Sequence, residues 1–206
     1  MDFKAKLASP SLRDQCEAAI SLRSEGTAGA QHLPALLARC KAIDLTNDMD
    51  RHEQSLVEFG AGTLSHIAGE IGFNHDNSLH QEILHWLIRT SSCREIRLAA
   101  FAVHGLGSLR VARRESIERL CEIIEAPRRN DENEHLSLRA LALRILRRLD
   151  QDLAARFVTK PAFDEYLHAV KHWIATNATQ NPDTREELAQ ELARLTETQT
   201  SQPDSS

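Results

Sequence analysis

The feature that most constrains the fold is a helical pattern that recurs at a fixed interval. Three segments start with an apolar residue and an arginine and continue with small and apolar residues on one helical face; they cover 12–20, 96–103 and 138–145. Their arginines lie 84 and 42 residues apart, which is two steps and one step of the same period: Arg13, Arg97 and Arg139. Such a period predicts stacked units, none of which buries its apolar face alone. A degenerate copy without the arginine is expected near residue 55.

A second amphipathic segment follows each copy. Its apolar residues recur near i, i+3, i+4 and i+7, the spacing of one helix face. The four segments carry Leu33, Leu36, Leu37 and Cys40; Leu79, Ile83, Leu84 and Leu87; Ile117, Leu120, Cys121 and Ile124; and Phe163, Tyr166, Leu167, Val170 and Ile174. The repeating unit is therefore predicted to be a helical hairpin.

Turn and cap residues predict where these hairpins begin and break. Ser9 followed by Pro10 suits a helix N-cap with proline at the first helical position. Paired glycines are expected to break the first and third hairpins and to interrupt the second copy: Gly26 and Gly29, Gly105 and Gly107, and Gly60 and Gly62.

The segment 94–107 resembles a known family. Its sequence, Arg-Glu-Ile-Arg-Leu-Ala-Ala-Phe-Ala-Val-His-Gly-Leu-Gly, is similar to the first helix of a HEAT repeat, including the phycobilisome-lyase-like subgroup, and 11–22 and 137–149 resemble it more loosely. The resemblance implies an all-α fold, a short α-solenoid of about four HEAT-like hairpins plus a C-terminal capping helix over 183–198. We expect one domain over 1–198 and a disordered polar tail over 199–206.

Composition narrows the functional classes. The chain has 206 residues, of which 41% are hydrophobic and 4% aromatic, a balance that favours helices over a β-sandwich. No apolar stretch approaches the length of a membrane span, and the first residues lack a signal peptide's apolar core. The four dispersed cysteines suit buried thiols in a reducing compartment: Cys16, Cys40, Cys93 and Cys121. A cytoplasmic protein is expected.

Motifs for catalysis are scarce. The sequence contains neither a G-x-S-x-G elbow nor a glycine-rich phosphate loop, so a non-enzymatic protein without a cofactor is favoured. Glu165, His168 and His172 share one helical face and present a candidate metal-ligand set. The preferred interpretation is that they lie on the solvated side of an amphipathic helix, because no H-E-x-x-H motif accompanies them.

The second helices are the predicted binding surface, because such helices line the concave face of HEAT-type stacks. Aligning their apolar residues produces one row of Arg39, Trp86, Ile123 and Ala169 and an adjacent row of Ala38, His85, Glu122 and His168. The candidate partner-binding residues are Arg39, His85, Trp86, Arg89, Glu122, Ile123, His168 and His172. Trp86 and Ile123 would form an apolar centre for a protein partner such as a scaffolded protein or an inhibitor's target, or they would broaden the core between hairpins.

Two alternatives from other classes stay open. An arginine-rich segment could contact the phosphates of a nucleic acid, as in HEAT-like DNA glycosylases, through Arg128, Arg129, Arg139, Arg144, Arg147 and Arg148. The formal net charge of −5 and the interspersed acidic residues favour a solvated face instead. The lyase-like resemblance also admits a protein that acts on a bilin.

Overall fold

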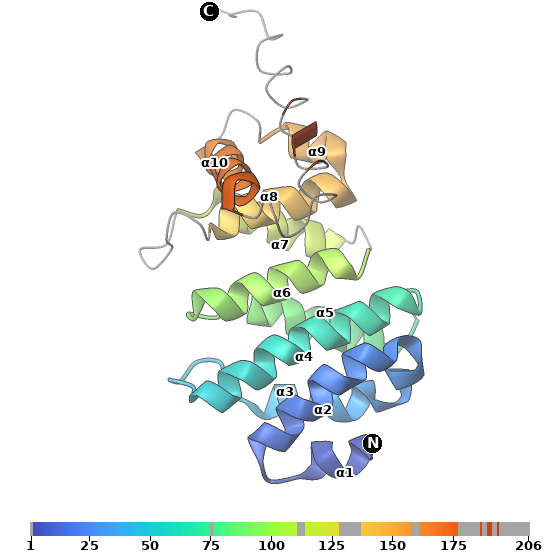
Figure 1. The fold of residues 1–206 in the computed structure, drawn as a ribbon. Coiled ribbons are helices and arrows are strands. Elements are labelled where there is room, and N and C mark those ends of the chain that lie inside the picture. Colours follow the sequence, from blue (N-terminus) through green and yellow to red (C-terminus); the bar gives the residue numbers. More distant parts are fainter. Residues whose placement is uncertain are drawn as a thin grey trace, which may run out of the picture.

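The computed structural model describes residues 2–74, 76–110, 114–127, 137–157 and 161–176, together with residues 186, 189, 190 and 193. All regular structure within these ranges is helical, which confirms the predicted all-α class (Figure 1). The elements are α1 (Phe3–Ala8), α2 (Leu12–Glu25), the 3-10 helix η1 (Gly26–His32), α3 (Leu33–Ala42), α4 (Arg51–Glu70), α5 (Ser78–Thr90), α6 (Ile96–Ser108), α7 (Arg114–Glu125), α8 (Leu138–Leu149), α9 (Gln151–Ala155) and α10 (Pro161–Thr176). The expected capping helix and tail lie outside the described residues, apart from the isolated positions given above.

The helices follow one another along a stack of two layers. One layer consists of α2, α4, α6 and α8, each packed against the next, and α3, α5 and α7 lie behind it (Figure 1). α10 packs principally against α8, in the first layer, at the opposite end of the stack from α1. In Figure 1 α10 lies in front of α8 whereas α7 lies behind it, so α10 does not extend the row of second helices, contrary to the expectation. None of the described helices is long and apolar enough to cross a membrane.

Side-chain caps define where the main helices begin. Asp50 and Glu53 form a reciprocal capping box on α4, in which the Asp50 carboxylate accepts from the Glu53 amide at 2.9 Å and the Glu53 carboxylate accepts from the Asp50 amide at 2.9 Å. Ser11, not Ser9, caps α2. Ser9 closes α1 instead, because Pro10 separates the two helices and cannot continue the first.

At two of the three glycine pairs, the glycines do not break or interrupt a helix as predicted. Gly26 ends α2 with φ at +56°, a conformation that favours glycine, as expected. In contrast, Gly60 lies within the continuous helix α4, and Gly105 and Gly107 lie within α6. These three sites face neighbouring helices so closely that a Cβ atom would overlap Cys40 Sγ, Leu87 Cδ2 and Ile145 Cδ1, respectively. They permit close packing and do not break the helices.

α6 contributes to two hydrophobic cores at once. Leu98, Ala102 and Leu106 join the core that extends toward the N-terminus. Ala99, Ala100 and Val103 face the opposite way and join the core built with α7, α8 and α10. The two exposed residues of this helix are Arg97 and His104. They lie seven residues apart, on one narrow stripe of the helix surface. α6 therefore connects the two halves of the stack.

The α4–α6 contact is tightest at Gly69. A Cβ atom there would overlap the carbonyl oxygen of Ser108, which is backbone and cannot rotate away. The crossing of these helices consequently depends on the missing side chain. Elsewhere in α4, a Cβ atom added at Gly62 would lie 3.3 Å from Arg23 Nη1, the end of a flexible side chain that can move aside.

Gly69→Ala is expected to lower the free energy of unfolding by about 1–3 kcal/mol, the usual cost of overpacking. Gly62→Ala is the matched control in the same helix and should leave stability unchanged or raise it by up to about 1 kcal/mol, because alanine favours helix. Urea denaturation followed by circular dichroism measures both changes. Equal effects of the two substitutions would contradict the proposed backbone contact.

Candidate functional site

The predicted apolar centre of the second-helix surface is buried. Trp86 is 3% exposed and Ile123 is 6% exposed, and they belong to the N-terminal and C-terminal cores, respectively. The Trp86 ring reaches Gly60 of α4, where an added Cβ would lie 3.9 Å from Cη2. These two residues therefore fill joints between hairpins, the alternative considered above, and they do not form an exposed apolar centre, although Ile123 contributes to the lining of one recess.

The adjacent predicted row lies on the surface. Ala38, His85, Glu122 and His168 are all exposed, as are Arg39 and Arg89 of the first prediction, while His172 is half-buried. The alignment of the second helices holds, because its aligned core residues Leu36, Ile83 and Leu120 are all buried. The row of Trp86 and Ile123 faces the core, and the row one residue earlier, about 100° around the helix, faces the surface. Since α10 packs on α8, His168 and His172 do not continue the row formed by α3, α5 and α7.

A trough runs between α3 and α5. The outward residues of α3 on this side are short and recur every four positions: Pro34, Ala38 and Ala42. Leu37 and Leu79 contribute apolar side chains to the lining of this trough, which has a volume of about 530 Å³. Lys41 Nζ and a carboxylate oxygen of Glu82 form an ion pair at 2.8 Å across it. The trough exists because these positions of α3 carry no long side chain.

Two further recesses continue this trough. The first, of about 590 Å³, shares Lys41 and Ala42 with it and extends to Arg89 and Ser92. The second, of about 280 Å³, shares Ser92 and reaches the α7 residues Arg119, Glu122 and Ile123. The three recesses together form what we call the second-helix groove, which passes α3, α5 and α7 in turn.

Arg119 joins α5 to α7 at the α7 end of the groove. Its guanidinium donates to Ser91 Oγ at 2.8 Å and to the Ser91 carbonyl oxygen at 3.2 Å, and it pairs with Glu122 at 2.9 Å. The bond to the carbonyl also satisfies a backbone group where α5 ends. α5 and α7 are therefore fixed relative to each other by a charged side chain that is mostly buried.

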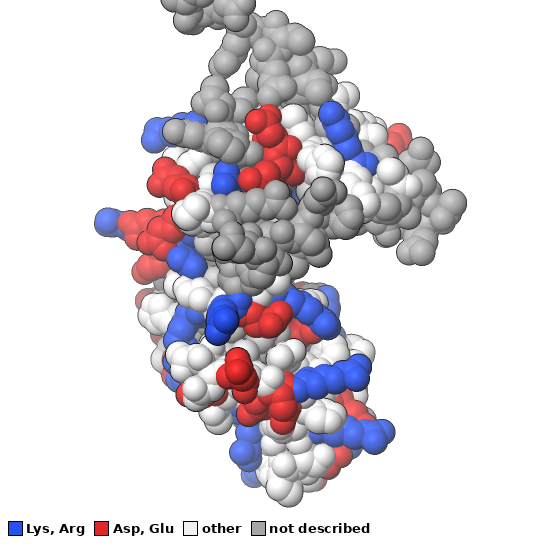
Figure 2. Space-filling model, turned by 90° about the vertical axis from the view of Figure 1, so that its left-hand side faces the viewer, with Lys and Arg blue, Asp and Glu red and all other residues white. Residues whose placement is uncertain are grey.

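Charges of both signs surround the groove. Figure 2 views the molecule from the side on which α4 and α6 begin, and Lys and Arg alternate there with Asp and Glu over the part that the structure describes. Asp44 accepts hydrogen bonds from the hydroxyl and amide of Thr46, which hold the pKa of its carboxyl below the ordinary value. Arg89 is exposed, and no acidic group among the described residues pairs with it. A partner of mixed charge suits this surface better than a uniform polyanion.

The predicted arginine patch divides between two sides of α8. Arg139 pairs with Glu165 of α10 at 3.5 Å, and Arg147 lies 5.7 Å from the centre of the Tyr166 ring. Arg148 lines a recess on the other side, toward α6, and Arg144 is close enough to His104 to act on its pKa. Arg128 and Arg129 lie outside the described residues. The described arginines of the patch do not form one continuous phosphate-facing row.

Glu165 has a structural role in the candidate metal-ligand set. Its carboxylate accepts from Ser137 Oγ at 2.6 Å, the same hydroxyl that caps the start of α8, in addition to pairing with Arg139. Among the residues that the structure describes, no three His, Cys, Asp or Glu side chains are placed to share a metal ion. Glu165 therefore connects α10 to the beginning of α8.

Two of the thiols, those of Cys16 and Cys40, lie in surroundings that oppose ionisation. Burial raises the pKa of Cys16 to about 11, with a contribution from the Asp50 carboxylate, and burial also raises the pKa of Cys40. The Cys16 and Cys40 thiols lie against the carbonyl oxygens of His52 and Leu56. Because the thiolate is the nucleophile, these two cysteines suit packing and not catalysis.

The chain matches no family model, and comparisons with curated proteins and with solved structures find no similar protein. The resemblance to HEAT repeats consequently rests on the segment 94–107 and on the period of the helices.

Trp86→Ala is expected to lower the free energy of unfolding by about 3–5 kcal/mol, because it opens a cavity between α4 and α5. His85→Ala, at the next position of the same helix, should change it by less than about 0.5 kcal/mol because His85 is exposed. Thermal or chemical denaturation compares the two variants. If Trp86→Ala did not lower the free energy of unfolding, Trp86 would again be a candidate for binding a partner.

Proposed function

We propose that this protein is a HEAT-like α-solenoid that acts as a non-enzymatic binding module for another protein. The layered order of α2 to α8 and the period of 42 residues support the solenoid. The function is that of a scaffold, adaptor or inhibitor, in which the second helices present the contact surface.

The continuity of the second-helix groove carries this proposal. Its three recesses share lining residues, so one segment of a partner can occupy them in succession. Separate pockets would suit separate small ligands, whereas a run of connected recesses suits an extended or helical polypeptide.

The chemistry of the groove specifies the partner segment. The α3–α5 trough is lined by Leu37, Ala38 and Leu79, so it accepts an apolar side chain, whose full burial contributes about 1.5–3 kcal/mol. Arg89, in the next recess, is available to an acidic side chain. The expected partner segment therefore carries an apolar anchor followed by an acidic residue.

Photo-crosslinking in the native cell tests this proposal. A benzophenone amino acid at position 85, exposed on α5 between the recess-lining residues Glu82 and Arg89, is expected to reach the groove and capture a distinct polypeptide. The same residue at position 28, exposed on η1 and outside all three recesses, should not capture it. Capture of the same polypeptide at both positions, or at neither, would contradict the assignment of the groove.

Blocking the trough provides the second half of the test. Ala38→Arg places a long side chain in the trough at an exposed helical position, where arginine is a good helix former, so stability should change by less than about 0.5 kcal/mol. The variant is expected to lose the crosslink formed from position 85, and Ala28→Arg should keep it. Persistence of the crosslink in Ala38→Arg would show that the partner does not enter the trough.

A further inference from the structure

We propose that His80 is a proton-sensitive latch, which holds the turn between α4 and α5 closed while its imidazole is neutral and releases the turn when the imidazole is protonated. This turn covers 71–77, of which the structure describes all residues except His75. The latch needs no partner, so it stands independently of the binding function proposed above.

The latch is a hydrogen bond that only a neutral imidazole can accept. The backbone amide of Asn74 donates to His80 Nδ1 at 2.8 Å. Because a backbone N–H is always a donor, Nδ1 is the acceptor, and the single proton of the neutral ring is on Nε2. Both ring nitrogens of an imidazolium carry a proton, so protonation of His80 places two N–H groups against each other and breaks the bond.

Asn74 connects this hydrogen bond to the rest of the turn. Its side-chain oxygen accepts from the Asp76 amide at 2.9 Å, and its carbonyl oxygen accepts from the Asn77 amide at 3.3 Å. Asn77 in turn caps α5, since its side-chain oxygen accepts from the amides of Leu79 at 2.9 Å and His80 at 3.4 Å. Loss of the bond between Asn74 and His80 is therefore expected to loosen both the turn and the first residues of α5.

Burial opposes protonation of His80 while the turn is closed. The residue is 3% exposed, and the centre of its ring lies 5.2 Å from that of Phe73, which packs against the N-terminal core. Burial lowers the pKa of His80 below its ordinary value, because a buried charge loses its hydration. A proton is consequently bound more tightly in the open turn, where the imidazole reaches water.

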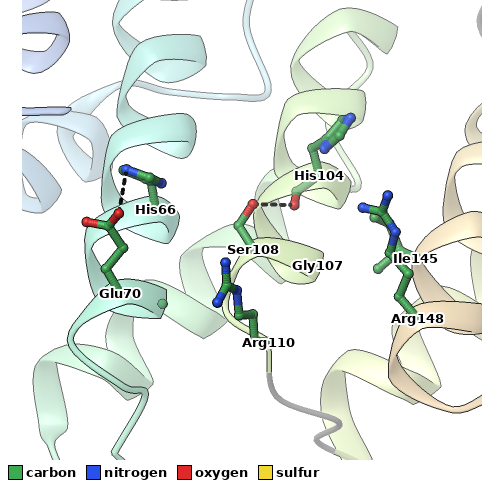
Figure 3. A pocket seen from close by; sticks show the side chains of 9 residues that line it. His66, Glu70, His104, Gly107, Ser108, Arg110, Ile145 and Arg148 are labelled. Atoms are coloured by element: carbon green, nitrogen blue, oxygen red, sulfur yellow. Dashed lines mark hydrogen bonds and ion pairs between the residues drawn. The ribbon is translucent and has the colours of Figure 1, made fainter. Parts of the chain in front are cut away.

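Ionisable groups of the packed helices do not change this behaviour. α5 packs against α3, α4, α6 and α7. Glu70, at the end of α4, pairs with His66 of the same helix, and Arg110, beyond α6, lines the same recess as Arg148 (Figure 3). Burial is nevertheless the one cause, among the described residues, that shifts the pKa of His80. The same holds for charged groups of the turn, of α5 itself and of α3 and α7, such as Asp76, Glu82, Lys41 and Arg114.

The latch lies beside the second-helix groove. Leu79 precedes His80 and lines the α3–α5 trough. Release of the turn removes the Asn77 cap from the Leu79 amide, so the start of α5 loosens and the trough changes shape. A partner in the trough would then bind less tightly at acid pH; this consequence rests on the proposed function, whereas the latch itself does not.

The effect of acidification has a defined sign. In the open turn His80 has its ordinary pKa of about 6.5, and in the closed turn its pKa is lower. The closed turn is therefore fully stable above about pH 6.5. As the pH falls below that value, the open population rises by up to about tenfold per pH unit, until the pH reaches the lower pKa of the closed turn.

NMR of the purified protein from about pH 7.5 to about pH 5, the range in which histidines titrate, tests the latch. Nitrogen shifts of the imidazole should show neutral His80 with its proton on Nε2. The protection of the Asn74 amide against hydrogen exchange, corrected for the intrinsic exchange rate at each pH, is expected to fall by up to about tenfold per pH unit below pH 6.5.

Two variants assign the effect to His80. His80→Asn removes the titrating group but keeps a side-chain oxygen near the position of Nδ1, so the protection of the Asn74 amide should no longer change with pH. His85→Asn, at an exposed position of the same helix, is the matched control and should behave like the wild type.

The wild-type titration decides the proposal by itself if His80→Asn does not fold. Constant protection of the Asn74 amide across this pH range, or a neutral His80 with its proton on Nδ1, would overturn the proposal. A fall in protection that persists in folded His80→Asn would assign the effect to another group, such as His75, and would also overturn it.

Discussion

The burial of α6 on two opposite faces is the contact on which the rest of the structure depends. Most helices of a small protein bury one stripe, but α6 supplies apolar side chains to both hydrophobic cores. Its residues must be small enough for α4 and α8 to approach from both sides, which the alanines and the two glycines of its sequence provide. If α6 were displaced, each half of the stack would expose the core that it shares with the other.

Missing side chains also shape the surface. Inside the stack, glycines allow α4, α6 and α8 to approach, and the recess around Arg110 lies where two of these approaches meet. On the opposite layer, Pro34, Ala38 and Ala42 leave the trough that begins the second-helix groove.

Much of the fold could be predicted from the sequence, because helical periodicity records which face of each helix is buried. The core residues of the second segments, such as Leu36, Leu84 and Leu120, are fully buried as the pattern predicts. Glycine was interpreted less well. Gly105 and Gly107 resemble helix breakers in the sequence, and only the distances to Leu87 and Ile145 show that they are packing sites.

The candidate site was harder to predict. One step along a helix separates a buried row from an exposed one, so the sequence left two interpretations of Trp86 and Ile123 open, a binding centre or core between hairpins, and only the structure shows that they are buried. The spacing of short residues at Pro34, Ala38 and Ala42 was present in the sequence and could have indicated the trough. The recess that Arg110 and Arg148 line could not be predicted, because it joins residues of three helices whose proximity depends on the glycine contacts.

Native-state hydrogen exchange tests the central position of α6 most directly. If α6 connects both cores, its amide protons should exchange only through global unfolding, with a free energy of exchange equal to the free energy of unfolding. Those of α1 and α10, at the two ends of the stack, should exchange through smaller openings. Exchange of the α6 amides at a lower free energy than those of α4 and α8 would contradict this account.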